Sequence, residues 1–276
     1  AAADVVVAAP GDGGELLHEP REAVRGDGRD RRGAAGRRPL LDEREAPVLP
    51  PHVQQVQPAV VGIKVRVPLD RPSAFTLGHE RWGGGVIFDP AGYALTVSYV
   101  LLDAAMIQVS LRDGRVVPAK LVGLDLEHGL GVIKLEGDGP WPSAPLGNSA
   151  SVGVGEPTAT IGVNDDNELV VTQGRVQEIR SFAGYWEYLI DRAFVVAPYN
   201  PAFGGSPLVN GQGEVIGITS LRLGDRPYVN LAIPTQAAVG QLVTIQVLDE
   251  EGQVIWSESA FVPEGESAMT AELVSQ

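Results

Sequence analysis

The sequence predicts an all-β protein made of two six-stranded antiparallel β-barrels with few short helices. Gly (34) and Pro (21) are abundant among the 276 residues, whereas aromatic residues make up only 6%, as is typical of short strands joined by tight turns. Segments of β type fall into two groups of about six each. Only residues 100–105 and 235–242 have a helical pattern. The 44% hydrophobic content is ample for a packed core and excludes global disorder.

The first group of strands begins with an alternating segment at residues 60–67, where Lys64 and Arg66 share one face. Asp113 and Gly114 form a turn signal between two apolar runs and predict a hairpin. The other strands expected in this group are residues 84–88, 93–96, 107–111, 115–118, 120–124 and 131–135.

The second group is expected at residues 158–161, 169–179, 188–196, 206–209, 214–221 and 228–233. A hairpin of residues 243–248 and 253–257 and a third candidate strand at 268–274 follow. The predicted organisation is therefore a disordered or extended tail (1–50), a first barrel (51–150), a second barrel (151–242) and a C-terminal strand extension (243–276).

Charge and composition exclude several classes of function. A net charge of −14, from 35 acidic and 21 basic residues, disfavours nucleic acid as a partner. The absence of Cys excludes disulfides, thiolate metal sites and a cysteine nucleophile. No stretch approaches the roughly 18 apolar residues of a membrane span.

The N-terminal tail combines an Arg-rich run at residues 26–38 with Pro39, Pro47, Pro50 and Pro51, which are expected to break regular structure. The run is expected to be solvated, with an acidic partner as the alternative. A chain that begins at Ala1 rather than Met suggests a processed or truncated N-terminus. A removed signal or anchor segment is one interpretation, and with it an extracytoplasmic location, periplasmic or secreted, is expected.

Six blocks of the sequence resemble, in order and spacing, segments of the HtrA/Deg-type trypsin-like serine proteases. They are residues 84–96 (GGVIFDPAGYALT), 129–135 (GLGVIKL), 145–149 (PLGNS), 200–210 (NPAFGGSPLVN), 213–218 (GEVIGI) and 231–234 (LAIP). The resemblance covers about residues 55–242 and implies a chymotrypsin-like double barrel with its site in the cleft between the barrels. Residues 243–276 do not resemble the PDZ domain that usually follows in this family.

The resemblance implies that all three positions of the catalytic triad are substituted. The family's T-N-N-H-V places its histidine at Tyr99, the aspartate that opens D-L-A-V-L-K falls on Gly129, and the serine of N-P-G-N-S-G-G-P falls on Gly204. Peptide hydrolysis by this route needs a hydroxyl nucleophile, an imidazole base and a carboxylate that orients the imidazole. Glycine supplies no side chain, and tyrosine has an ordinary pKa of about 10.

The neighbouring cleft residues are also altered. Ala202 replaces the glycine two residues before the nucleophile position, and Phe203 adds bulk where a substrate carbonyl would approach. Phe203 either projects beside a bound partner or folds inward and closes the cleft. Tyr185 and Trp186 either form one wall of the cleft or pack in the core. Phe203, Ala202, Tyr185 and Trp186 are therefore the hypothetical binding residues.

Other routes to catalysis meet the same obstacle. Ser206 would act only if the loop were re-registered, and Ser98 would need its own base. His128 lies beside the former aspartate position rather than the base position. The oxygen-rich residues 164–168 (NDDNE) lack the spacing of a calcium loop and are interpreted as a hairpin tip. No metal or cofactor is expected.

The sequence thus favours a catalytically inactive, HtrA-like pseudoprotease that serves as a scaffold. Its expected partner is a protein or extended peptide, held in the cleft between the barrels or at a strand edge. Two alternatives remain open, namely an active or re-registered serine endopeptidase and a structural subunit of a larger assembly.

Overall fold

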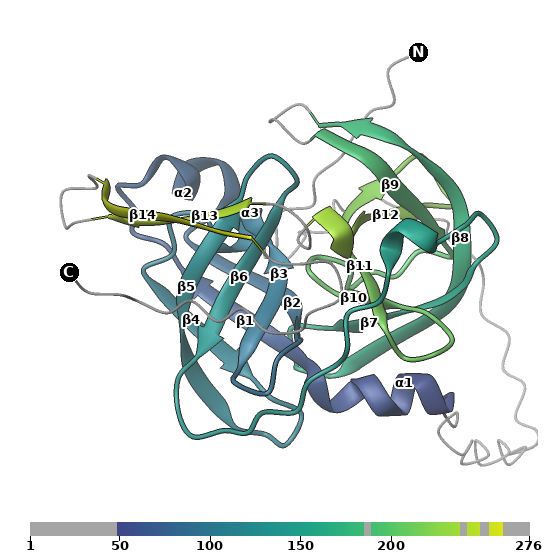
Figure 1. The fold of residues 1–276 in the computed structure, drawn as a ribbon, viewed down its shortest axis with the longest axis horizontal. Helices are drawn as coiled ribbons and strands as arrows, with labels where there is room; N and C mark the ends of the chain where they lie inside the picture. Colours follow the sequence, from purple (N-terminus) through teal and green to yellow (C-terminus); the bar gives the residue numbers. More distant parts are fainter. Residues whose placement is uncertain (1–48, 185–188, 238–241, 249–253, 262–276) are drawn as a thin grey trace, which may run out of the picture.

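The computed structural model describes residues 49–184, 189–237, 242–248 and 254–261. In this part of the chain two closed, antiparallel six-stranded barrels stand side by side, as expected (Figure 1). A separate two-stranded hairpin accompanies them. The described residues include no helix long and apolar enough to cross a membrane.

The first barrel has the strand order β1-β2-β3-β6-β5-β4 and is closed where β1 pairs with β4. The expected strands at 115–118 and 120–124 were wrong as separate elements. They form one strand, which continues through Pro118 because the Pro118 carbonyl still accepts a hydrogen bond from the Glu136 N–H (2.9 Å). The strands are β1 (Val60–Arg66), β2 (Glu80–Ile87), β3 (Tyr93–Val97), β4 (Met106–Ser110), β5 (Val116–Asp125) and β6 (Leu130–Leu135).

The second barrel has the order β10-β11-β12-β9-β8-β7 and is closed where β10 pairs with β7. Its strands carry many fully buried side chains, among them Ile161, Phe194 and Leu208. Its strands are β7 (Pro157–Val163), β8 (Leu169–Ala183), β9 (Leu189–Ala197), β10 (Pro207–Val209), β11 (Val215–Leu223) and β12 (Val229–Pro234).

The described helical segments are short, and four of the six were not predicted. Both α1 (Pro51–Val56) and α2 (Pro72–Leu77) begin on a proline, a position where the missing N–H costs nothing. The expectation that Pro51 breaks regular structure was therefore wrong. The other segments are η1 (Gln57–Ala59), α3 (Ser98–Leu101), η2 (Ser149–Ser151) and η3 (Thr235–Ala237).

The C-terminal hairpin is confirmed as β13 (Leu242–Leu248) and β14 (Val254–Phe261), with β13 beside β5 of the first barrel (Figure 1). Of the helix expected at residues 235–242, the start is the short η3 (Thr235–Ala237), and the end is wrong because Leu242 already belongs to β13. Residues 238–241 lie outside the described residues. The tail before residue 49 and the candidate strand at 268–274 lie outside the described residues.

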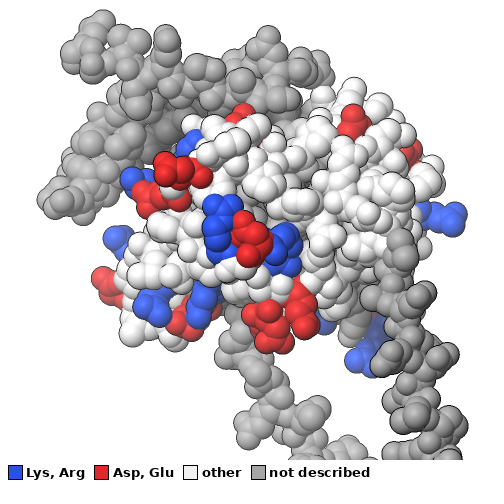
Figure 2. Space-filling view, turned by 90° about the horizontal axis from the view of Figure 1, so that it is seen from below, with Lys and Arg blue, Asp and Glu red and all other residues white. Residues whose placement is uncertain are grey.

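The described surface carries charges of both signs. Viewed from below, acidic and basic residues alternate over the barrels rather than gathering into one field (Figure 2). Exposed pairs such as Arg66 with Glu80 (3.2 Å) and Lys120 with Glu136 (2.8 Å) belong to this pattern. Such exposed pairs contribute little to the free energy of unfolding.

Candidate functional site

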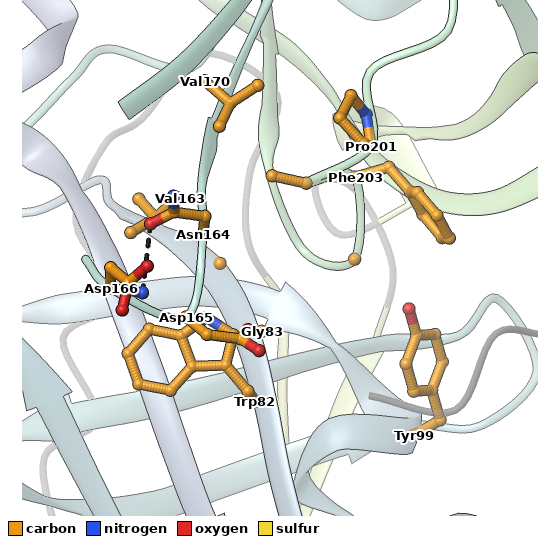
Figure 3. A pocket seen from close by; sticks show the side chains of 13 residues that line it. Trp82, Gly83, Tyr99, Val163, Asn164, Asp165, Asp166, Val170, Pro201 and Phe203 are labelled. Atoms are coloured by element: carbon orange, nitrogen blue, oxygen red, sulfur yellow. Dashed lines mark hydrogen bonds between the residues drawn. The ribbon is translucent and has the colours of Figure 1, made fainter. Parts of the chain in front are cut away.

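A pocket of about 450 Å³ lies between the two barrels (Figure 3). The first barrel supplies residues of β2 and α3, and the second supplies the β7–β8 turn and the loop before β10. The lining residues are Trp82, Gly83, Gly84, Tyr99, Val163, Asn164, Asp165, Asp166, Val170, Pro201, Ala202, Phe203 and Gly204. Of the residues predicted from the sequence, the structure thus brings Tyr99, Ala202, Phe203 and Gly204 to one place.

Tyr99 faces the backbone of Gly204 across this pocket. Its side chain is only 9% exposed, and its hydroxyl donates to the carbonyl of Ser220 (3.0 Å). Ser220 lies at a register shift of β11. A Cβ added to Gly204 would lie 2.8 Å from the Tyr99 Oη atom. The tyrosine hydroxyl therefore takes up the space that a side chain at position 204 would need.

Arg81 fixes the helix that carries Tyr99. This arginine is 1% exposed, and its guanidinium donates to the carbonyls of Tyr99 (2.9 Å) and Leu102 (2.8 Å) and to the Ser73 Oγ atom (2.7 Å). Burial lowers the pKa of Arg81. Since these hydrogen bonds satisfy the buried guanidinium, they bind α3 and α2 to β2.

The loop before Gly204 is held by buried polar side chains. The Ala202 N–H donates to Asn200 Oδ1 (2.9 Å), and Asn200 Nδ2 donates to the carbonyl of Val170 (2.8 Å). Asn200 is fully buried, and its own N–H donates to Asn230 Oδ1 (2.7 Å). The Ala202 N–H, one of the two donors that the resemblance would assign to an oxyanion hole, is thus already paired within the loop.

Phe203 is turned into the protein although part of it lines the pocket. It is 7% exposed, and its ring centroid lies 5.9 Å from that of Tyr199. Its carbonyl accepts hydrogen bonds from the Ser206 N–H (2.9 Å) and the Thr219 hydroxyl. Burial raises the pKa of the neighbouring Tyr199. The aromatic side chain is therefore part of the packing of this loop.

Gly205 brings the two barrels into close contact. Its φ of +85° is in the left-handed region, and a Cβ there would collide with the Gly84 carbonyl oxygen. Next to it, the Gly84 N–H donates to the Gly204 carbonyl (2.7 Å). The loop before β10 thus lies directly on the backbone of β2.

Gly129 lies beneath the start of α3 rather than in the pocket wall. Its φ is +85°, and its carbonyl accepts from the Ser98 N–H (2.9 Å). In the same turn, His128 Nδ1 is 2.8 Å from Asp125 Oδ2. Neither Gly129 nor any of the described histidines (His52, His79 and His128) lines the pocket.

Ser206, the serine considered for a re-registered site, is fully buried. Its hydroxyl donates to the Ala202 carbonyl. A Cβ added to Gly84 would lie 2.9 Å from the Ser206 Oγ atom, so this hydroxyl is directed at the interface with β2. Ser98, the other candidate, is 3% exposed.

The structure also places in the pocket Trp82 and the turn between β7 and β8, which the sequence did not mark as functional. Asn164 Oδ1 accepts from the N–H groups of Asp166 (3.1 Å) and Glu168 (2.8 Å), so the oxygen-rich stretch is a hairpin tip as predicted. Trp82 directly precedes Gly83 and Gly84, and this position next to the first family block is the signal that could have marked it as a pocket residue. Tyr185 and Trp186 lie outside the described residues.

Comparisons with known proteins agree with this fold. Residues 83–218 match the family described as trypsin-like peptidase domain. The serine endoprotease DegS of Escherichia coli K12 is 33% identical over 196 residues, 67% of this chain and 54% of DegS. The serine protease HhoA of Synechocystis, named as putative, is 34% identical over 160 residues, 56% of this chain and 41% of HhoA. The chain spans about half the length of the curated relatives it matches.

A solved structure has the same architecture. The HtrA-type protease AlgW with a tripeptide superimposes with a TM-score of 0.58 at 28% sequence identity, covering 68% of this chain and 60% of AlgW. The double barrel and the site between the barrels define a trypsin-like peptidase domain. Within that class, the chain belongs to the HtrA-type trypsin-like serine protease family.

Proposed function

We propose that this chain is a catalytically inactive member of the HtrA-type family, a pseudoprotease that binds an extended peptide or protein segment in the cleft between its barrels. The observation that carries the proposal is the 2.8 Å approach between the Tyr99 hydroxyl and a Cβ built on Gly204. The resemblance aligns these two residues with the base and the nucleophile. They meet as those groups must, but without an imidazole or a nucleophilic side chain.

The rest of the site supports the same proposal. With the Ala202 N–H paired to Asn200 Oδ1, one oxyanion donor is committed within the loop. An oxyanion hole that loses one donor loses about 10²–10³ in rate. The pocket has a volume of about 450 Å³, which is within the range of binding sites for small ligands. This volume supports the proposal of a site that binds without hydrolysing.

The alternative of a working serine endopeptidase rests on the relatives, which are named as proteases. It would require a nucleophile outside the aligned position. Ser206 is fully buried and donates to the Ala202 carbonyl, and Ser98 is 3% exposed beside Gly129. A nucleophile needs a base within hydrogen-bond reach and access to the substrate, and burial opposes that access for both serines.

The lack of hydrolysis is tested with an active-site probe. A fluorophosphonate probe should leave this chain unlabelled under conditions that label DegS, because the probe reacts only with an activated serine. The Ser206→Ala and Ser98→Ala variants are the matched controls. Labelling of the chain that disappears in either variant would establish an active enzyme and overturn the proposal.

We also propose an extracytoplasmic location. Among the relatives is a probable periplasmic DegP-like endoprotease of Halomonas elongata, 36% identical over 160 residues. Fusion of the native gene product to a reporter that is active only outside the cytoplasm tests this location.

Membership of a larger complex is tested by the elution volume of the native protein on size exclusion.

A further inference from the structure

We infer that the pocket between the barrels selects a basic side chain, Lys or Arg, of the extended peptide that the proposed function assigns to this cleft. The inference rests on that proposed function and names the chemistry of its ligand. The residues that carry it are Trp82, Asp165 and Asp166, on the side of the pocket away from Tyr99 and Phe203 (Figure 3).

The charge of the pocket is one-sided. Asp165 and Asp166 are exposed carboxylates at its edge, and no Lys or Arg is among its lining residues. The described surface elsewhere places the two signs beside each other, as Lys64 and Arg66 do with Glu80. Neither Asp165 nor Asp166 forms an ion pair with another described residue. Both carboxylates are therefore available to attract a cation that enters this pocket.

Trp82 supplies an aromatic surface beside these carboxylates. Its indole lines the pocket, and tryptophan is the aromatic side chain that binds a cation best through its ring face. Trp82 therefore adds an aromatic cation-binding surface to the acidic edge of the pocket.

The acidic turn is held in place by the other barrel. Arg112, between β4 and β5, donates to the Asn167 carbonyl (2.8 Å) and to its side-chain oxygen. Asn167 has a φ of +63°, and its Oδ1 atom also lies near the Trp82 ring over Gly62. Burial lowers the pKa of Arg112. The turn that carries the two aspartates is thus fixed before a ligand arrives, which reduces the ordering cost of binding.

The experiment compares three nine-residue, end-capped, alanine- and valine-based peptides that differ at the central residue, which is Arg, norleucine or Glu. Binding to the full chain is measured by fluorescence anisotropy, and each peptide is then checked for cleavage by mass spectrometry. The Arg peptide should bind about three- to tenfold more tightly than the norleucine peptide, and the Glu peptide more weakly than both. Trp82→Leu should lower the affinity for the Arg peptide by at least about twofold.

The matched variants separate the pocket from the overall negative charge. Asp165→Asn with Asp166→Asn should abolish the preference for Arg over norleucine. Asp70→Asn with Asp138→Asn changes the net charge equally at exposed positions outside the pocket, and should keep the preference. Equal affinity for Arg and norleucine, or equal losses in both double variants, would overturn the inference.

Two further outcomes separate this inference from the proposed lack of hydrolysis and from binding of the chain's own tail. Cleavage of an Arg peptide that still requires Asp165 and Asp166 would overturn the proposed lack of hydrolysis but support the basic subsite. If the Arg peptide binds only after Arg29, Arg31 and Arg32 of the tail are changed to Gln, the chain's own tail is the occupant, and the inference of an external ligand fails.

Discussion

The hydroxyl of Tyr99 and the α-carbon of Gly204 are matched to each other. A Cβ on Gly204 would lie 2.8 Å from Tyr99 Oη, and that hydroxyl donates to the Ser220 carbonyl (3.0 Å). The φ of Gly204 is not positive, so any residue could adopt this backbone conformation. Glycine is required here because the Tyr99 hydroxyl occupies the space of a side chain. The residues at these two positions, which the resemblance aligns with the base and the nucleophile, are therefore physically linked.

The first prediction concerns this pair. Gly204→Ala should lower the free energy of unfolding by about 1–3 kcal/mol, because the added methyl group overpacks against Tyr99 Oη. Tyr99→Phe should cost about 0.5–1.5 kcal/mol through the lost hydrogen bond. Urea unfolding of the double variant should show less than the sum of the two losses, since the phenyl ring no longer presents the hydroxyl. Strictly additive losses would refute the linkage.

The second prediction is that restoring the triad does not restore proteolysis. Tyr99→His, Gly129→Asp and Gly204→Ser together should leave casein cleavage far below that of DegS. The reasons are that the Ala202 N–H stays paired with Asn200 and that Phe203 stays in the loop. Adding Ala202→Gly and Phe203→Asn, as in the family motif, should increase cleavage. Strong cleavage by the triple variant alone would contradict the prediction.

The third prediction concerns Phe203. Because this side chain is 7% exposed and packs against Tyr199, Phe203→Ala should cost about 3–5 kcal/mol of unfolding free energy. Phe75, which is 83% exposed, is the matched control, and Phe75→Ala should change the stability by less than about 0.5 kcal/mol. An unchanged melting temperature in Phe203→Ala, together with weaker peptide capture, would instead identify Phe203 as a contact residue.

The fourth prediction compares two arginines. Arg81→Met removes donors from the carbonyls of Tyr99, Leu102 and Gly78 and should cost at least about 3 kcal/mol, because buried acceptors are left unpaired. Arg66→Met removes only an exposed pair with Glu80 and should cost less than about 1 kcal/mol. Thermal and urea unfolding of both variants measures the difference. Similar losses would show that Arg81 does not hold α3.

Much of the fold could be predicted because each barrel strand and turn has a signal within a few neighbouring residues. The alternation in β1, the Asp113–Gly114 turn and the ordered family blocks each mark an element within a few residues. Errors arose at prolines. Pro51 was interpreted as a breaker but begins α1, and Pro118 was interpreted as a strand end but lies within β5. Proline lacks a backbone N–H, so it interrupts a helix or strand only where that N–H would have donated a hydrogen bond.

The sequence by itself determined the family, the two barrels and the identity of the residues at positions 99, 129 and 204. Only the tertiary structure decided what those residues do to one another. The approach of Tyr99 to Gly204, the pairing of Ala202 with Asn200 and the burial of Ser206 join segments that are separated in the chain or depend on loop geometry. The same holds for Trp82, which lies in one pocket with Asp165 and Asp166, where Arg112 of the first barrel holds the β7–β8 turn of the second. Side-chain contacts between distant segments follow from packing, which no local pattern encodes.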